Sequence, residues 1–472
     1  MEEVQTNKIE DIINHLKVWF EGTSDIVVSE KMYQEFTLTF MYCPHLVDMT
    51  KLNELIFPAI YYVWEKNKFL SFDLLSDVLE VTQLKDTMNG KKKVEEKLYS
   101  GELILYSHDL NDLLFIPISK FPKRSPEESN LESSIRGPRD GFVENISDNM
   151  ALIRQRLKTS TLKSVEYSIG EKTKTKIVLQ YMNDLINPTV LEEVKKRLES
   201  IQVDILISSY EVEKRLFDHT LSLFPLVDHS GRPDFAVRAL SQGRFVILID
   251  GNPTCLIGPT NFNQTLFSPE DMHESFFYIR IVRLFRFIAL LTTIFLPRFY
   301  ISLISYQIDQ LPFSLVATIS ASRIGLPLSA PTETFLMLVL FELFKEAGVR
   351  LPKPVGQTVA VLGGLFIGDA AIRAGLTSPS CLVVISITVI SGYILINQTI
   401  SNNIVLLRLF VLFVSSFLGL YGFFIAFFII VTGLVSLESF GNPYLSSLSR
   451  PDFNGIRKKL MRTALQFMKK RD

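Results

Sequence analysis

Apolar and polar positions divide the chain near Leu284. Before this point charged and apolar residues are mixed, and after it apolar runs dominate almost to the C-terminus. Because a helix needs about 20 apolar residues to cross a bilayer, four runs are candidate membrane helices: Leu284–Ile304, Val355–Ala374, Cys381–Ile396 and Ile404–Leu437. A soluble protein could bury such helices, but four of them in one third of the chain, with almost no charged face, are unusual. We therefore predict an α-helical polytopic membrane domain over residues 281–438.

The last of these runs has an ambiguous length. Ile404–Leu437 is long for one crossing and short for two, and Gly419 and Gly422 divide it into halves of roughly 15 residues. It is predicted to be a tight hairpin, one long tilted helix or a kinked helix. Arg408, in its first half, must reach the membrane surface or find a partner. With the shorter apolar segment Pro331–Ala347 included, the expected number of crossings is four to six.

Basic residues flank the membrane region on both sides, although the formal net charge is only -1. Such a balance gives no overall attraction to nucleic acid. By the positive-inside rule both flanks are expected in the cytoplasm, so the number of crossings is expected to be even. Met1–Asp11 lacks the basic and apolar regions of a signal peptide. The basic flanking residues are Arg280, Arg283, Arg286, Arg457, Lys458, Lys459, Arg462, Lys469, Lys470 and Arg471.

The residues before the membrane region alternate between helix and strand patterns, which is typical of α/β domains. We predict two cytosolic α/β subdomains, residues 23–122 and 136–280, joined by a polar linker at 123–135. An N-terminal helical extension, 1–22, and a basic cytoplasmic tail, 439–472, complete the organisation. The predicted strands are Phe36–Met41, Leu113–Ile118, Val165–Ile169, Lys176–Tyr181, Val203–Ile207 and Phe245–Ile249, and the predicted helices are Leu52–Trp64, Phe72–Leu79, Val143–Lys158 and Thr189–Ser200.

Six short motifs give a more specific indication. They are RGPRDGF at Arg136–Phe142, NMALIRQRLK at Asn149–Lys158, QGRFVILIDG at Gln242–Gly251, FSPED at Phe267–Asp271, EAGVRLPKP at Glu346–Pro354 and GDAAIRAGLTSP at Gly368–Pro379. In this order they resemble the A subunits of the GerA-type nutrient germinant receptors of endospore-forming bacteria. The similarity runs from about Glu21 to Arg450.

This resemblance implies a function and partners. It implies a cytosolic two-part region joined to a membrane domain, in a receptor that releases spores from dormancy. Such an A subunit is thought to act beside a transporter-like B subunit and a lipoprotein C subunit, and to form a homo-oligomeric, ring-shaped ion channel. The implied location is the spore inner membrane or the cell membrane, with both termini in the cytoplasm.

Small residues recur along one apolar run and suggest close helix contacts. Gly356, Ala360, Gly364 and Gly368 lie four positions apart, on one face of a helix, and Gly363 widens that face. Small residues let membrane helices approach closely. The face can belong to a helix repeated around a symmetric pore, or it can pack against other helices of the same chain.

Two carboxylates lie within the segment Pro331–Ala347. Glu333 and Glu342 are nine positions apart, about 180° around a helix, so they cannot share one face. An ionisable group at membrane depth usually faces a cavity or a partner, and we expect one of the two to pair within the chain while the other meets water or a neighbouring subunit. The alternative is an interfacial or re-entrant segment with both carboxylates near the headgroups.

Of these carboxylates, Glu342 is the first candidate for a conduction path. It matches the F-E pair that precedes the E-A-G-V-R-L-P motif of the resembled family, and rings of acidic residues select cations in pores. Asp369 is a third acidic candidate, but its spacing from Arg373 predicts a local ion pair at the membrane surface.

The chain offers little sign of enzymatic chemistry. Its six histidines are scattered, and it has neither a phosphate-binding loop nor a nucleophile elbow. We predict no metal site, no cofactor and no disulfide framework. Arg136 and Arg139 could bind an anion, clamp a subunit contact or simply belong to a turn. The sequence thus predicts a non-enzymatic membrane receptor subunit that forms a nutrient-gated cation channel, or alternatively a non-conducting scaffold that couples partner proteins.

Overall fold

The computed structural model describes residues 23–33, 36–83, 90–107, 113–120, 136–218, 222–350, 368–395 and 397–446. The chain forms two compact units, Met1–Thr220 with Val227–Pro259, and Leu221–Leu226 with Thr260–Asp472. The predicted extension at 1–22, the linker at 123–135, most of the run Val355–Ala374 and the basic end of the tail lie outside the described residues.

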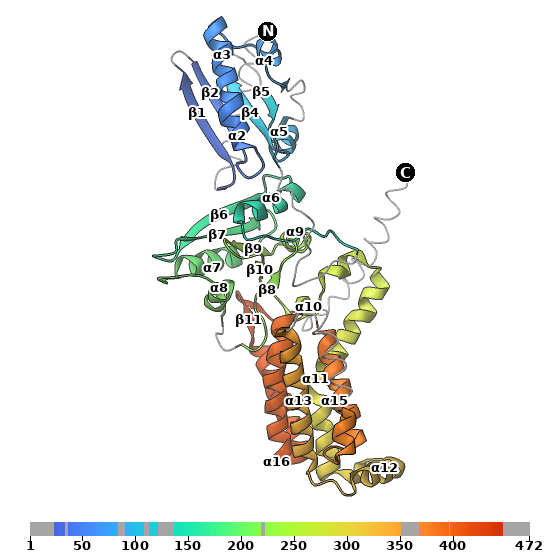
Figure 1. Ribbon diagram of the computed structural model, residues 1–472. Helices are drawn as coiled ribbons and strands as arrows, with labels where there is room; N and C mark the ends of the chain where they lie inside the picture. Colours follow the sequence, from blue (N-terminus) through green and yellow to red (C-terminus); the bar gives the residue numbers. More distant parts are fainter. Residues whose placement is uncertain are drawn as a thin grey trace. The chain divides into compact units, whose positions relative to one another are not determined.

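The first unit begins with a five-stranded antiparallel sheet (Figure 1). Its order is β1-β2-β4-β5-β3, formed by Val27–Tyr33, Phe36–Tyr42, Glu102–Ser107, Leu113–Pro117 and Thr82–Gln83. Side chains of β4 alternate between two cores because successive strand residues point to opposite faces. Leu103 and Leu105 pack with helix α3 (Phe57–Asn67), whereas Ile104 packs with helix α5 (Gly90–Leu98). The predicted strands Phe36–Met41 and Leu113–Ile118 are confirmed as β2 and β5.

A second five-stranded antiparallel sheet follows in the same unit. Its order is β6-β7-β9-β10-β8, formed by Leu162–Ile169, Thr175–Met182, Phe245–Ile249, Cys255–Gly258 and Asp228–Ser230. Every residue of β9 is buried. The helices of this part are α6 (Ile146–Arg156), α7 (Pro188–Glu199), α8 (Ser209–Leu216) and α9 (Pro233–Ser241).

One predicted strand of this region is wrong. Val203–Ile207 forms no strand. Its apolar residues Ile205 and Ile207 are 47% and 75% exposed. The backbone oxygen of Val203 instead accepts from Glu171 N–H in the turn between β6 and β7.

A buried ion pair connects the start of β1 with α6. The Arg154 guanidinium donates to Asp25 Oδ2 from Nε at 2.6 Å, and both side chains are at most 2% exposed. Arg154 also donates to the backbone oxygens of Thr159 and Leu162 and lies 4.4 Å from the centre of the Tyr99 ring. Burial alone would lower the pKa of Arg154, but the Asp25 carboxylate outweighs it and the pKa is raised. The buried Arg154 charge is therefore compensated by the Asp25 carboxylate, two backbone oxygens and the face of the Tyr99 ring.

Replacing Asp25 by asparagine should lower the free energy of unfolding of the first unit by about 3–5 kcal/mol, because it leaves the Arg154 charge buried without its counter-charge. Thermal or denaturant unfolding of the full-length protein measures this loss. The matched control is Lys172→Gln, which removes an ion pair whose side chains are 70% and 73% exposed and should change stability by less than about 1 kcal/mol. Equal stability of the two variants would contradict the argument.

The second unit is mainly helical. Its long helices are α11 (Phe276–Tyr306), α13 (Ala330–Arg350), α15 (Pro379–Ile394) and α16 (Gln398–Ser436), with the short α12 (Phe313–Arg323) between α11 and α13. Among the described residues, α11 and the span Thr399–Ser436 are long and apolar enough to cross a membrane, and α15 is a shorter apolar helix. The four long helices share one apolar core, which includes Ile301, Leu338, Ile385 and Leu412.

Helix α16 is a hairpin, one of the three forms that the sequence left open. Gly419 has φ 58° and ψ -138°, which is not helical. A straight helix of 39 residues would separate its ends by about 58 Å. The two ends instead meet neighbouring residues, because Asn403 Nδ2 donates to Leu223 O and Ser439 Oγ donates to Leu226 O. The chain therefore reverses at Gly419, and its two halves run side by side (Figure 1).

The tip of this hairpin is held by the C-terminal end of α11. Tyr306 Oη donates to Ser416 O, and Gln307 Oε1 accepts from Leu420 N–H at 3.4 Å. These contacts satisfy backbone groups that a helix break leaves without intrahelical partners. A Cβ added to Gly419 would lie 2.8 Å from Tyr306 Cγ.

Gly419→Ala should destabilise the helical unit by about 1–3 kcal/mol, because a positive φ strains any residue with a Cβ and the methyl group meets Tyr306. Thermal unfolding and membrane abundance of the full-length protein measure the effect. Gly433→Ala is the control, since a Cβ at this helical position meets nothing within 4 Å. It should leave stability unchanged or raise it by about 0.5–1 kcal/mol. Normal abundance and stability of Gly419→Ala would disprove the strain.

Candidate functional site: charged groups within the helical bundle

The start of α11 is fixed by a charged contact. Asp271 accepts from both terminal nitrogens of Arg286, at 2.6 and 2.9 Å, and its carboxylate also caps the short helix at Pro269–His273 by accepting from Ser268 N–H. Arg286 is buried in this pair. The last residue of the FSPED motif thus anchors the first long helix through its ion pair with Arg286.

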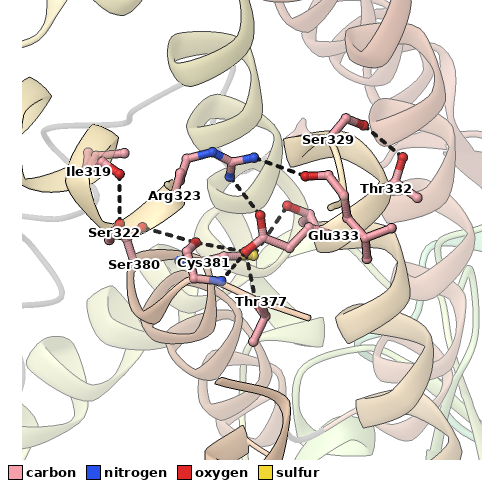
Figure 2. A network of polar contacts seen from close by, with 12 residues as sticks. Ile319, Ser322, Arg323, Ser329, Thr332, Glu333, Thr377, Ser380 and Cys381 are labelled. Carbon is pink, nitrogen blue, oxygen red and sulfur yellow. Dashed lines mark hydrogen bonds and ion pairs between the residues drawn. The ribbon is translucent and has the colours of Figure 1, made fainter. Parts of the chain in front are cut away.

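Glu333 lies at the centre of a second polar network, drawn in Figure 2. Its side chain is fully buried in the first turn of α13. Oε2 accepts from Arg323 of α12 at 2.7 Å, and Oε1 accepts from Thr377 Oγ1 at 2.9 Å, from Ser378 N–H at 2.6 Å and from Ser378 Oγ at 2.8 Å. The network joins α12, α13 and the beginning of α15.

Burial and hydrogen bonding together hold the Glu333 carboxylate in place. Three donors point at Oε1 and one at Oε2, and the side chain is fully buried. The N-terminal ends of α13 and α15 add favourable partial positive charge. Glu333 is therefore a structural clamp in this conformation, and the LTSP end of the last sequence motif supplies three of its four donors.

Glu342 has a different environment two and a half turns along the same helix. Oε2 accepts from Arg408 of α16 at 2.8 Å, and Oε1 accepts from Lys345 at 3.3 Å. The Glu342 side chain is 33% exposed, while that of Arg408 is only 6% exposed. Two of its lone-pair sites remain available for water or an ion.

A small cavity adjoins this pair. Its free volume is about 30 Å³, enough for one or two water molecules. The charged groups at its wall are Glu342, Lys345 and Arg408, and the uncharged side chains with a hydroxyl group are Thr293, Thr388, Tyr393 and Ser401. The cavity thus lies among α11, α13, α15 and α16 and is lined by charged and hydroxyl side chains from all four helices.

The two carboxylates point to different partners, as their spacing predicted. The expectation that only one would pair within the chain was wrong, because both have arginine partners. The predicted need of Arg408 for a partner is met by Glu342. The sequence analysis missed Arg323, Thr377 and Ser378 as partners of Glu333, and no local signal could have identified them, since the last two lie more than forty positions away.

The other candidate residues are elsewhere. Asp369 forms the expected ion pair with Arg373, at 2.9 Å, with both side chains exposed. Gly368 is buried, and a Cβ there would lie 3.0 Å from Leu382. Arg136 and Arg139 are exposed, with Arg136 at a bend of the first unit. Gly356, Ala360, Gly363 and Gly364 lie outside the described residues, so the role of the small-residue face stays a prediction.

Comparison with known proteins identifies the family. The model of the Bacillus/Clostridium GerA spore germination protein family matches residues 14–472. The chain belongs to this family. Spore germination protein XA of Bacillus anthracis is 40% identical over 97% of this chain and 94% of its own length. Spore germination protein A1 of Bacillus subtilis (strain 168) is 32% identical over 89% of this chain and 87% of its own length.

A further relative and a solved structure are also similar to this chain. The uncharacterized membrane protein YfkQ of Bacillus subtilis (strain 168) is 37% identical over 76% of this chain and 70% of its own length. A solved structure, the N-terminal domain of the A subunit of the Bacillus megaterium spore germinant receptor GerK3, is 24% identical with a TM-score of 0.40. The match covers 53% of this chain and 94% of that domain.

Among the described residues of this GerA family member, no three His, Cys, Asp or Glu side chains are grouped so that they could hold a metal ion.

Proposed function

We propose that this chain is the A-type membrane subunit of a nutrient germinant receptor and that its helical bundle forms a cation channel in a homo-oligomeric ring. The family membership supports a role in spore germination. The observation that carries the channel is Glu342, a partly exposed carboxylate that lines a polar cavity among the long apolar helices. Ionisable groups at such positions are costly and usually serve ion pathways.

In this proposal the Glu342–Arg408 pair belongs to the closed state. Opening moves α13 relative to α16, separates the pair and turns the Glu342 carboxylate toward the passing cations. Nutrient binding, sensed with a transporter-like B subunit and a lipoprotein C subunit, can drive this change only if it favours the open state energetically. The chain itself is proposed to be non-enzymatic.

Exposed apolar side chains support a bundle that is covered by lipid or by neighbouring copies. The α16 hairpin exposes a series of large residues, and water is an unfavourable environment for so many of them together. They include Phe413, Phe417, Tyr421, Phe424 and Phe428.

Ion flux into liposomes tests the channel. Purified full-length protein is reconstituted alone and with its B and C partners, and cation release is followed before and after nutrient addition. Nutrient-dependent flux supports the channel. Reconstituted complexes that bind nutrient but never conduct would instead support the alternative, a non-conducting scaffold that couples the sensing partners.

We further propose that the bundle crosses the membrane an even number of times, with both termini in the cytoplasm or spore core. The start and end of the helical region lie together, since Phe262 N–H donates to Tyr444 O at 3.0 Å and Thr260 N–H donates to Ser439 Oγ at 3.1 Å. The basic flanks favour the inside. Reporter fusions at the two termini should therefore both report an internal location, and a fusion to the loop between α11 and α13 should report the outside. An external C-terminus would refute the arrangement.

A further inference from the structure

Positive charge exceeds negative charge beside the cavity of the bundle. Arg408 and Lys345 both line it, and Glu342 is its one carboxylate among the described residues. A third cation, the fully buried Arg298 of α11, donates to the backbone oxygen of Arg408 rather than to a carboxylate. Two cationic side chains and one carboxylate thus line the cavity, and a third cationic side chain contacts the backbone of Arg408.

The hydrogen bonding of these arginines is incomplete. Nε of Arg408 and Nε of Arg298 are both buried, and neither has a partner among the described residues. Arg408 is only 5% exposed and forms part of the cavity wall. A buried donor without an acceptor is costly, and a buried charge without compensation more so. The Arg408 side chain, whose hydrogen bonding is incomplete, therefore borders a space into which a small ligand could fit.

Among the described residues, no acidic side chain of the helical region other than Glu342 lines the cavity. Residues 276–437 contain five acidic side chains, Asp309, Glu333, Glu342, Glu346 and Asp369. Glu333 and Asp369 form ion pairs with other arginines, Arg323 and Arg373. The undescribed stretch 351–367 contains neither Asp nor Glu.

We propose that this cavity binds a small monovalent anion of halide size, held by Arg408 and Lys345 and stabilised by the nearby charge of Arg298. The size of the cavity decides the ligand class. A free volume of about 30 Å³ accepts one or two water molecules or a chloride ion, but an amino acid or a sugar needs several times this space. Thr388 and Ser401 provide hydroxyl groups at the wall. The anion balances the charge of the bundle in the conformation described here.

The proposal does not depend on conduction, so a stability measurement can test it. The thermal unfolding temperature of the full-length protein in detergent is measured while chloride replaces gluconate, at constant ionic strength and with one cation. Gluconate is too large for the cavity. The wild-type unfolding temperature should rise with chloride concentration and reach a plateau, and bromide should act in the same way. Equal unfolding temperatures in chloride and gluconate would overturn the proposal.

Two variants make the result specific. Arg408→Gln should abolish the dependence on chloride, whereas Arg215→Gln, at an exposed position of α8, should keep it. Glu342→Gln removes the one nearby negative charge and should lower the apparent Kd for chloride by about tenfold. Weaker chloride binding by Glu342→Gln would overturn the proposal and indicate a cation site instead. The Glu342→Gln test depends only on whether the apparent Kd for chloride falls or rises. It therefore still decides the question if Arg408→Gln fails to fold.

Discussion

Glu333→Gln is expected to destabilise the helical unit by about 3–5 kcal/mol and to remove most of the protein from the membrane fraction. An amide has one oxygen. If it accepts from Thr377 and Ser378, its NH₂ group must face the Arg323 guanidinium, and two donors then oppose each other inside the protein. If the amide is reversed, the Ser378 donors lose their acceptor. Either arrangement leaves buried polar groups without partners.

Thermal unfolding of the purified full-length protein and its abundance in membranes measure this loss together. Asp369→Asn is the matched control, since it makes the same chemical change in an ion pair whose carboxylate side chain is 59% exposed. Such surface pairs contribute at most about 1 kcal/mol. A Glu333→Gln protein as abundant and as stable as the Asp369→Asn protein would show that the clamp is dispensable.

The apolar runs predicted the helices of the second unit well. Leu284–Ile304, Cys381–Ile396 and Ile404–Leu437 correspond to α11, α15 and α16, because the composition of a long apolar helix is visible without knowledge of its neighbours. The hairpin was one of three alternatives. The hairpin form is stabilised by Tyr306 and Gln307, which contact the turn at Gly419 from more than one hundred positions away. The sequence alone therefore did not distinguish it from the other two forms.

The pairing of charges could be predicted only in part. The sequence shows that Arg408 lies in an apolar run and needs a partner, but Glu342 is 66 positions from it. Ser378 is 45 positions from Glu333. Local spacing revealed the Asp369–Arg373 pair because both residues share one helix. Arg298, also within an apolar run, carried the same kind of signal and was overlooked. Contacts between helices depend on packing that a single sequence does not specify.

The strand that was predicted wrongly has a comparable cause. Val203–Ile207 is rich in β-branched apolar residues, as strands are, but this composition cannot tell whether a neighbouring strand offers a free edge. In the second sheet the segment does not pair as a strand, and two of its apolar side chains remain exposed. A short apolar run therefore located the inner strand β9 correctly, and the same kind of run at Val203–Ile207 failed to predict a surface loop.

Glu342→Gln is expected to change conduction in two separable ways, if the proposed channel is correct. The loss of the carboxylate lowers the local cation concentration in the open pore, so unitary cation conductance should fall. The loss of the Arg408 pair weakens the closed state, so the open probability without nutrient should rise. Membrane insertion and oligomer size should stay close to those of the wild type, because glutamine retains the size of the side chain and can still accept a hydrogen bond from Arg408.

The charge-reversed double variant, Glu342→Arg with Arg408→Glu, separates these effects. It restores an ion pair between α13 and α16 and should return the open probability without nutrient toward the wild-type value, since coupled charges show their interaction only when both are changed. It should not restore conductance, because the carboxylate now lies on α16 and an arginine occupies the proposed pathway. Planar-bilayer recordings of the receptor with its partners measure both quantities. Wild-type conductance and selectivity in Glu342→Gln would exclude this residue from the pathway. A wild-type receptor that responds to nutrient but never conducts would favour the scaffold, in which the same ion pair only holds two helices together.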